Sequence, residues 1–523
     1  MNLRLVARLL SIVSLLIGGA MCFSLPWAWP VLGRRKNLPL DSIGTFETRA
    51  FAALLISILA CLLVGGLLRY WGRSASGRLY RKEAMAVVGL SWVLASILGA
   101  LPFLLSGTCR GRDPVTQEPV KMHWIDGWFE SQSGFSTTGA TVISDLESSD
   151  LVPHCILFWR STTHFLGGLG ILVLFVVILG HGSAGKALMR VEMPGPTKEG
   201  VTPRMQDTAW LFALTYLGLN AVLAVILWLM GLSLFDALCH AFGTMATGGF
   251  STYNASVGHF QSSAIESVIL VFMILAGTNF ILLFYLLCLR PQRLLADIEW
   301  RTYAAILAIG SLLVMLVGWW YGDFDHGWEA LRYSLFQVVS IMTTTGYVTE
   351  DFDRWNHFAR GLLLTLMFVG GCAGSTGGGL KVIRHILLAK ILRLEIEQAY
   401  HPSVVRPLRL GGKAVEEGEL RKNILVYFAL IAVIFVGSWL LDITIEPDKT
   451  WGEGADHKLM DSASVIAATL NNIGPGLGTV GATQNYGHFS GGSKILFIWL
   501  MMLGRLEIFS ILVLLLPNFW RNR

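Results

Sequence analysis

The stretch Ser136-Thr137-Thr138-Gly139-Ala140-Thr141 is the first of four that decide how this chain folds. The second reads Met245-Ala246-Thr247-Gly248-Gly249-Phe250, and the third reads Thr343-Thr344-Thr345-Gly346-Tyr347-Val348. The fourth, Asn471-Asn472-Ile473-Gly474-Pro475-Gly476, keeps the glycine but lacks the threonines. Aligned on the glycines at 139, 248, 346 and 474, the stretches recur at intervals of about 100 residues, which indicates an internally repeated fold.

Each stretch ends a short segment of mixed polarity that lies between two longer apolar segments. The mixed segments are residues 123-138, 233-247, 328-345 and 458-473. A helix needs about 20 residues to cross the hydrocarbon core of a bilayer, so each mixed segment is too short to span it. We therefore expect four half-helices that enter the membrane and turn back, with their free backbone groups shielded by protein or water.

The composition is that of a chain that crosses a membrane many times. Of its 523 residues, 54% are hydrophobic and only 14% are charged, whereas an average soluble domain is about a quarter charged. The first apolar segment is expected to be a retained helix, because no clear cleavage site of small residues follows it. Ten spans are expected, at residues 8-32, 50-70, 84-106, 152-181, 208-231, 263-289, 302-321, 358-395 (interrupted), 422-442 and 493-517.

The expected fold is an all-α polytopic membrane protein with four pseudo-symmetric repeats around a central pore. Each repeat consists of a helix, a pore half-helix and a second helix, and two extra transmembrane helices precede the first repeat. The Lys and Arg residues gather in the links between repeats, which predicts that these links are cytoplasmic, although Arg34, Arg35 and Lys36 fall on the opposite side. The expected divisions are residues 1-83 for the N-terminal helix pair and 84-206, 207-298, 299-420 and 421-523 for the repeats.

Several other classes of protein are disfavoured by the residues. A formal net charge of +5 is too small to indicate nucleic-acid binding. The seven cysteines include no CxxC pair, so neither a disulfide framework nor a zinc site is indicated. The chain lacks an HExxH pair, a GxSxG elbow and a Walker A loop, so we expect neither an enzyme nor a covalent cofactor.

Threonine and glycine at the end of a half-helix suit a cation pore. Four extended strands with their carbonyls facing one axis make rings of oxygen that replace the hydration shell of a monovalent cation. Glycine permits the backbone angles that such a strand needs, and the carboxyl ends of the half-helices favour a cation. Tight helix packing by small residues explains one copy of the pattern but not four in register. The residues expected in the filter are Thr137, Thr138, Gly139, Ala246, Thr247, Gly248, Thr344, Thr345, Gly346, Asn472, Ile473 and Gly474.

A second glycine-rich tract, residues 370-379, interrupts the second helix of the expected third repeat. Its glycines are too dense for a regular helix, and apolar sequence flanks it on both sides. We expect an intramembrane loop that obstructs the pore below the filter; a helix-packing site is the alternative, although the tract is longer than a GxxxG motif. The gate residues expected in it are Gly370, Gly371, Gly374, Ser375, Thr376, Gly377, Gly378 and Gly379.

Charged residues inside or beside the apolar segments are the remaining candidates. Arg505 and Glu507 lie in the last span, where a charge must be paired or wet, so both are expected to face the bundle interior. Arg505 serves either as a positive barrier below the filter or as one partner of a structural ion pair. Glu130 and Asp236 are expected at the starts of half-helices, as partners of the helix dipole.

These motifs make the chain resemble the Trk/Ktr/HKT superfamily of potassium transporters over residues 84-517, most closely its bacterial pore subunits of the TrkH and KtrB type. The supporting motifs include Phe129-Glu130 and the tract from Asn471 to Gly476. Residues 1-83 resemble the additional helix pair of the TrkH type. The resemblance implies four helix–pore–helix units in one chain, with K⁺ bound at the filter residues.

The resemblance also assigns roles to single residues. Glycine at all four filter positions implies selectivity for K⁺, because a serine at the first position is associated with sodium transport in relatives. Asn472 and Ile473 depart from threonine, so the cage is not fourfold symmetric. The loop 370-379 matches the gating loop of the family, and Arg505 matches its pore arginine.

Function, location and partners are likewise implied by the resemblance. The chain is expected to be a potassium-uptake channel-like transporter in the bacterial inner membrane, with a coupled Na⁺/K⁺ or H⁺/K⁺ symporter as the alternative. Few intramembrane acids beyond Glu507 are present to support coupling. The implied partners are a second copy of the chain and a cytosolic nucleotide-binding RCK regulator of TrkA or KtrA type. The basic links Lys186 to Arg204 and Lys381 to Lys422 either dock this regulator or bind anionic lipid.

Overall fold

The computed structural model describes residues 1–29, 32, 45–75, 80–113, 115–179, 205–402, 409–410, 413–414, 417–451, 457–506 and 508–521. Several charged residues lie outside the described residues: Arg34, Arg35, Lys36, Lys186, Arg190, Lys198, Arg204 and Glu507. Most of the described residues are helical, as expected. The strands among them form two small antiparallel pairs: β1 (Cys109–Arg112) with β2 (Pro119–Lys121), and β3 (Arg409–Leu410) with β4 (Lys413–Ala414).

The longer helices account for most of the expected spans. Six of them are long and apolar enough to cross a membrane, judged by length and composition over the described residues: Leu3–Ala28, Thr48–Gly72, Lys82–Ser106, Trp210–Leu229, Ile298–Tyr321 and Arg421–Ile445. As structural elements they are α1 (Leu3–Met21) continued by η1 (Cys22–Ala28), α2 (Thr48–Gly72), α3 (Arg81–Ser106), α7 (Met205–Leu229), α12 (Ile298–Tyr321) and α16 (Glu417–Ile445).

The second helices of the repeats differ from one another. In the first repeat, α5 (His154–Leu179) is continuous. In the second, α9 (Ser263–Ala276) and α10 (Phe280–Leu287) meet at an angle of 114°, so the span expected over 263-289 is not one straight helix. The helix breaks there because the Asn279 side chain caps α10 by accepting a hydrogen bond from the Ile281 N–H (2.8 Å).

The other two second helices are interrupted as well. In the third repeat, α14 (His357–Leu366) and α15 (Val382–Tyr400) flank the glycine-rich tract, which confirms the expected interruption. In the fourth, α18 (Gly491–Arg505) ends well before residue 517, and the short α19 (Phe509–Leu512) follows a residue, Ile508, with φ +58°. The expected span 493-517 is therefore not one continuous helix.

Short helices occupy all four mixed segments, as predicted. They are α4 (Trp124–Phe135), α8 (Leu234–Met245), α13 (Gly327–Met342) and α17 (Lys458–Leu470). The remaining elements are brief: α11 (Pro291–Ala296), α20 (Pro517–Trp520), η3 (Ser256–Phe260), η4 (Phe352–Arg354), η5 (Asp448–Trp451), η7 (Gly478–Val480) and η8 (Val513–Leu515).

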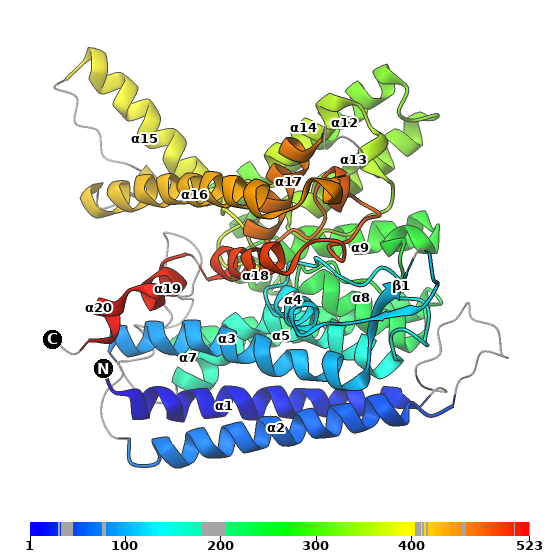
Figure 1. Cartoon of the computed structure of the whole chain (residues 1–523). Coiled ribbons are helices and arrows are strands. Elements are labelled where there is room, and N and C mark those ends of the chain that lie inside the picture. Colours follow the sequence, from blue (N-terminus) through cyan, green and yellow to red (C-terminus); the bar gives the residue numbers. More distant parts are fainter. Residues whose placement is uncertain are drawn as a thin grey trace.

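The helices pack around the four half-helices in two large buried clusters. One cluster joins α1 to α5 with α16 to α19, and the other joins α7 to α14. Figure 1 shows α1, α2 and α3 side by side along one edge, whereas α15 projects from the opposite part of the molecule. Glycines allow α1 and α2 to approach closely: a methyl group at Gly65 would stand 3.0 Å from Leu15 Cδ2.

Candidate functional site: a ring of four strand ends and the loop against it

All four half-helices end in the same hydrogen-bonded turn. In each, a backbone N–H donates to the carbonyl five residues earlier: Thr138 to Ser133 (2.9 Å), Gly248 to Gly243 (2.8 Å), Thr345 to Ser340 (2.9 Å) and Ile473 to Ala468 (3.0 Å). This bond defines a Schellman motif, in which the residue before the donor is left-handed. The chain therefore leaves every half-helix in the same direction.

In three of the four turns the left-handed residue is a threonine, which rarely adopts this conformation. Its φ is +52° at Thr137, +53° at Thr247, +60° at Thr344 and +56° at Asn472. Glycine usually fills this position, and a β-branched residue is strained there. Strain that recurs at three threonines around one centre marks the turns as a functional site rather than as simple helix ends.

The next glycine of each strand lies against a carbonyl of the following strand, and the four contacts close a ring. A methyl group at Gly139 would stand 2.1 Å from the Gly248 oxygen, and one at Gly249 would stand 2.0 Å from the Thr345 oxygen. At Gly346 it would meet the Ile473 oxygen (1.9 Å), and at Gly474 the Thr138 oxygen (2.7 Å). These glycines also have positive φ, between +74° and +92°. No other residue fits at these positions without moving the ring.

The ring corrects the register that we expected for the second strand. Gly249, and not Gly248, has the positive φ and the place in the ring that Gly139 has in the first strand. The set Ala246, Thr247 and Gly248 therefore shifts by one residue to Thr247, Gly248 and Gly249. Two adjacent glycines made both registers acceptable in sequence, and only the Schellman turn decides between them.

A cavity of about 110 Å³ opens on the outer side of the ring. Its lining includes all four ring glycines, Gly139, Gly249, Gly346 and Gly474. The four strand ends therefore surround one common space, which is reached from the side where the strands leave the half-helices. A dehydrated cation that entered this space would meet backbone groups of all four strands.

A buried ion pair supports the first and second strands. The Glu130 carboxylate accepts a hydrogen bond from Arg160 Nε (2.6 Å) and another from Thr141 Oγ1 (2.9 Å). Arg160 also donates to the Ser251 carbonyl (2.9 Å), and its guanidinium carbon stands 3.4 Å from the Phe250 ring centre. The pair thus holds the outgoing strands of two repeats in one network, and both of its side chains are buried.

The position of Glu130 corrects a second expectation. Glu130 lies in the middle of α4 rather than at its start, and the acid in the first turn is Asp126. Asp236 does lie in the first turn of α8, where its backbone N–H donates to the Ser233 side chain (3.0 Å). The helix-dipole role therefore fits Asp126 and Asp236, whereas Glu130 is a partner of Arg160.

The other repeats lack a carboxylate at the position that Glu130 occupies, five residues before the end of the half-helix. In the second repeat, His240 Nε2 lies 3.0 Å from Ser251 Oγ. In the third, Gln337 Nε2 donates to Thr349 Oγ1 (3.4 Å). The fourth repeat has Val465 there, which is apolar and buried. Only the first of these four described positions is occupied by an acidic residue.

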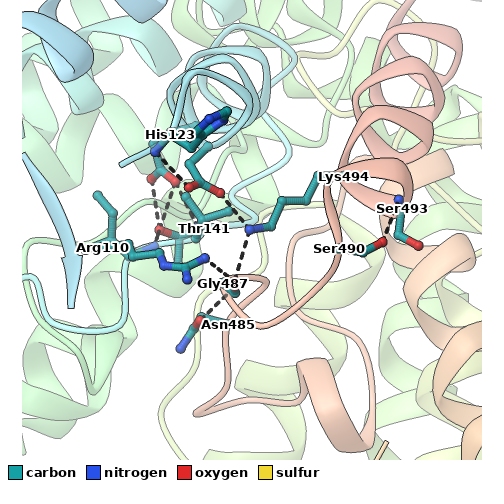
Figure 2. Close-up of polar contacts among 12 residues, drawn as sticks. Arg110, His123, Thr141, Asn485, Gly487, Ser490, Ser493 and Lys494 are labelled. Atoms are coloured by element: carbon teal, nitrogen blue, oxygen red, sulfur yellow. Dashed lines mark hydrogen bonds and ion pairs between the residues drawn. The ribbon is translucent and has the colours of Figure 1, made fainter. Parts of the chain in front are cut away.

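A second buried ion pair joins the first repeat to the fourth, as Figure 2 shows. Lys494 reaches from α18 toward α4, and its Nζ donates to Asp126 Oδ1 (2.6 Å) and to the Gly487 carbonyl (3.0 Å). Arg110 approaches Gly487 from β1 and donates to the same carbonyl (2.7 Å). These contacts hold the outer loop of the fourth repeat against the first half-helix.

Two titratable groups at the outer loops, away from the spanning helices, have shifted pKa values. Burial raises the pKa of the Asp353 carboxyl, although this carboxyl also accepts a hydrogen bond from the Gly478 N–H (3.0 Å). Burial lowers the pKa of His488 to about 4, so its imidazole is neutral at physiological pH. The outer loop of the fourth repeat thus carries no imidazolium charge from His488.

The glycine-rich loop lies directly against the inner ends of the half-helices. Thr376 Oγ1 donates to the Met245 carbonyl at the end of α8 (2.9 Å), and the Gly378 N–H donates to Thr344 Oγ1 (2.7 Å). A methyl group at Gly378 would stand 2.8 Å from Asn472 Cβ. The loop therefore touches the ends of the second, third and fourth half-helices, at the base of the ring.

The two ends of the loop are fixed by neighbouring helices. The Cys372 N–H donates to the Gly277 carbonyl (2.8 Å), so the loop pairs with the break between α9 and α10. Glu299, at the start of α12, accepts hydrogen bonds from the N–H groups of Ala373 (2.7 Å) and Ile383 (3.0 Å). Lys381 Nζ donates to the Gly377 carbonyl. These hydrogen bonds hold the loop in a defined conformation, and the buried side chains of Glu299 and Lys381 contribute to them.

Arg505 joins the loop to the first repeat. Its guanidinium donates to the Thr376 carbonyl (2.6 Å) and to the Gly167 carbonyl of α5 (3.1 Å). Both of these partners are backbone carbonyls. The guanidinium therefore lies between the glycine-rich loop and α5, at the base of the ring.

Sequence reasoning did not identify several residues of this site. Gly249, Arg160, Glu299, Lys381 and Lys494 all have contacts that position the ring or the loop. For Arg160 a signal was present, because a lone arginine inside the apolar segment 152-181 needs a buried partner. For Glu299 and Lys494 the partners lie 74 and 368 residues away, and no local pattern connects them.

Comparison with known proteins places this geometry in a family. Residues 51–521 match the family model described as TrkH, cation transport protein. The chain is 36% identical over 525 residues to the Trk system potassium uptake protein TrkH of Salmonella typhimurium, with both chains covered completely. It is 31% identical to the Trk system potassium uptake protein TrkG of Escherichia coli, over 96% of this chain and 98% of TrkG. The crystal structure of the potassium transporter TrkH from Vibrio parahaemolyticus superposes with a TM-score of 0.80 at 33% identity, with both chains covered completely.

Proposed function

The chain belongs to the TrkH family of cation transport proteins, and from that premise we propose how it selects and gates its ion. It is a multi-pass protein of the bacterial inner membrane and a potassium uptake transporter of the Trk type. The proposal concerns the filter, the gate and the partners.

The ring of four strand ends is the selectivity filter. A K⁺ ion loses its hydration shell there and is bound by backbone carbonyls, which include those of Thr138, Gly248, Thr345 and Ile473. The observation that carries this proposal is the closed ring of glycine-to-carbonyl contacts around one cavity. Filter residues from all four strands take part: Thr137, Thr138, Gly139, Thr247, Gly248, Gly249, Thr344, Thr345, Gly346, Asn472, Ile473 and Gly474.

The loop 370-379 and Arg505 form the gate. The loop lies across the base of the ring, and Arg505 adds a positive charge that opposes the passage of a cation. Opening requires the loop to leave Thr344 and Met245 and the guanidinium to leave the Thr376 carbonyl. The glycines of the loop make this change possible with little steric cost.

The proposed partners are a second copy of the chain and a cytosolic regulator. A homodimer bound to a cytosolic RCK-type nucleotide-binding subunit fits a membrane subunit of a Trk system. The described part of the basic link includes α15, with Lys390 and Arg393, and it projects away from the bundle, where such a subunit reaches it (Figure 1). Anionic lipid is the competing ligand of this link.

Flux through liposomes tests the filter. The purified chain should carry ⁸⁶Rb⁺ much faster than ²²Na⁺, and Gly139→Ser should reduce this preference while the protein stays folded. Gly437→Ser is the control, because a Cβ at Gly437 meets nothing within 4 Å. Equal Rb⁺ and Na⁺ fluxes in the unaltered chain would exclude a potassium filter. A current that does not reverse at the K⁺ equilibrium potential would favour coupled transport instead.

A further inference from the structure

An apolar cavity of about 440 Å³ lies between the N-terminal helix α1 and the first repeat. Leu16, Gly19 and Phe23 form its wall on the α1 side, and these residues are exposed on the surface of the bundle. Trp92 of α3 and Phe135 at the end of α4 form the inner wall, and both are buried. The cavity thus runs from the lipid-facing surface of α1 to the back of the first half-helix.

Water is a poor occupant of this cavity. Among the described residues that line it, only Ser91 and Trp92 carry polar side-chain atoms, and the Ser91 hydroxyl already donates to the Val87 carbonyl (2.6 Å). A buried water needs two to four polar partners, which this lining does not supply. An empty cavity is also unfavourable, because the atoms that line it lose their dispersion contacts.

Lipid hydrocarbon, which surrounds the spanning helices, is a more suitable occupant of this cavity than water. The cavity lies beside the middle of two spans, Leu3–Ala28 and Lys82–Ser106, where the solvent is lipid hydrocarbon. Its volume falls within the range of sites that hold small apolar ligands. Gly19 and Gly170 leave it open, because a methyl group at either position would meet no atom within 4 Å.

We propose that this cavity binds one acyl chain of a membrane phospholipid. The bound chain contacts Phe135, at the end of the first half-helix, and Gly167, whose carbonyl accepts a hydrogen bond from Arg505. Only the link from Gly167 to Arg505 rests on the proposed gate. The site itself is inferred from the shape, the lining and the membrane depth of the cavity. An acyl chain packed here supports the base of the filter from the side of the first repeat.

Photocrosslinking tests the proposal on the full chain. The protein is placed in liposomes of phosphatidylethanolamine and phosphatidylglycerol that contain a phosphatidylcholine with a diazirine in one acyl chain, and the adducts are mapped by mass spectrometry. We expect adducts on the peptides that contain Trp92 and Leu166. Gly170→Leu and Gly19→Leu fill the cavity from opposite walls and should each lower these yields by about threefold, since only packing holds the chain there.

Two controls make the result decisive. Adducts on Leu67 of α2, which is 70% exposed, should be unchanged in both variants. Gly218→Leu, at another glycine with open space around it, should leave the yields at Trp92 and Leu166 unchanged. Yields at the cavity walls that stay constant in both filled variants would overturn the proposal. The measurement does not depend on transport, so a failure of the proposed filter leaves it interpretable.

Discussion

The four half-helices resemble one another closely, whereas the second helices differ from repeat to repeat. Each half-helix ends in a Schellman turn with a left-handed residue, followed by a glycine with positive φ. The second helices differ in every repeat: α5 is continuous, α9 and α10 are bent by 114°, α14 and α15 flank a loop, and α18 ends at Arg505. One protein therefore contains a nearly fourfold outer part and an asymmetric inner part.

The roles proposed for the two parts account for this difference. A single cation at the centre is bound best by equal groups from all sides, so the same backbone conformation is needed four times. A gate needs only one mobile segment to block the pore. With four mobile segments, the movement of any one of them would let ions pass. The outer part departs from fourfold symmetry in the side chains behind the ring. We therefore expect substitutions of these side chains to have the largest effects.

The largest effect is expected from the buried pair behind the first strand. Glu130→Gln leaves the Arg160 guanidinium, which is fully buried, without its carboxylate. We expect a loss of about 3–5 kcal/mol in the free energy of unfolding, because an uncompensated charge remains in a dry site. Thermal unfolding in detergent, followed by tryptophan fluorescence, measures this loss as a lower melting temperature.

Two further variants separate charge from packing. Glu130→Gln combined with Arg160→Met should recover much of the stability, because both charges are then absent. Arg354→Ala breaks the exposed Arg354–Asp351 pair and should cost only about 1 kcal/mol. If Glu130→Gln melts like the unaltered chain, the pair does not support the outer part, and the first repeat is no different from the others.

The second prediction concerns the backbone that the four strands share. Gly249→Ala adds a methyl group 2.0 Å from the Thr345 oxygen, at a φ of +74°, and should lower ⁸⁶Rb⁺ uptake by about 100-fold. Gly248→Ala should also impair uptake, but for another reason, because its methyl group meets the His164 ring at 2.4 Å.

Truncation of His164 distinguishes the two glycines. His164→Ala removes the ring that obstructs residue 248, so it should restore part of the uptake in Gly248→Ala. It should restore none in Gly249→Ala, where the obstacle is a backbone carbonyl. If His164→Ala restored uptake equally in both variants, Gly248 rather than Gly249 would belong to the ring. The outer part would then lack its fourfold symmetry.

The third prediction addresses the asymmetric inner part. Arg505→Ala removes the guanidinium that joins Thr376 to Gly167, and we expect uptake without a regulator to rise by about tenfold, because a barrier of about 1.4 kcal/mol is lost. Arg505→Lys keeps the charge but not both hydrogen bonds, so it should give an intermediate rate. Arg301→Ala, at an exposed arginine of α12, is the matched control. Unchanged uptake in Arg505→Ala would assign Arg505 a purely structural role.

The sequence predicted the outer part far better than the inner part, and the reason is physical. A repeated backbone conformation needs the same residue types each time, so the half-helices and three of the four ring glycines could be read from the pattern. Gly249 was missed because its neighbour is also a glycine, and the choice between them depends on where α8 ends.

Partners that are distant in sequence could not be predicted. The tract 370-379 signals that a helix breaks, since glycines cannot hold it, but not where the loop then lies. That position depends on Glu299, Gly277 and Thr344, each of which meets the loop from another helix. Likewise, the bend between α9 and α10 depends on three residues, Gly277 to Asn279, in an otherwise apolar segment.

The smallest effect is expected where the outer part itself departs from fourfold symmetry. Asn472 takes the left-handed position that threonine takes in the other three strands. Its Nδ2 donates to Thr138 Oγ1 (2.9 Å) and to the Met501 carbonyl of α18 (2.9 Å), so it joins the fourth strand to the first and to its own second helix. Asn472→Thr makes the four strands more alike in sequence but removes both hydrogen bonds.

If symmetry of side chains mattered most, Asn472→Thr would sharpen the preference for Rb⁺ over Na⁺. We expect the reverse, a reduction of about threefold, because two hydrogen bonds are lost and asparagine tolerates the left-handed conformation better than threonine. Asn472→Asp removes the donor with little change in shape and should reduce the preference in the same direction, whereas Asn471→Ala, next to it in the chain, alters no contact with the first strand. A stronger preference for Rb⁺ over Na⁺ in Asn472→Thr would contradict this prediction. It would mean that selectivity depends on identical side chains in the four strands rather than on the hydrogen bonds of the Asn472 amide.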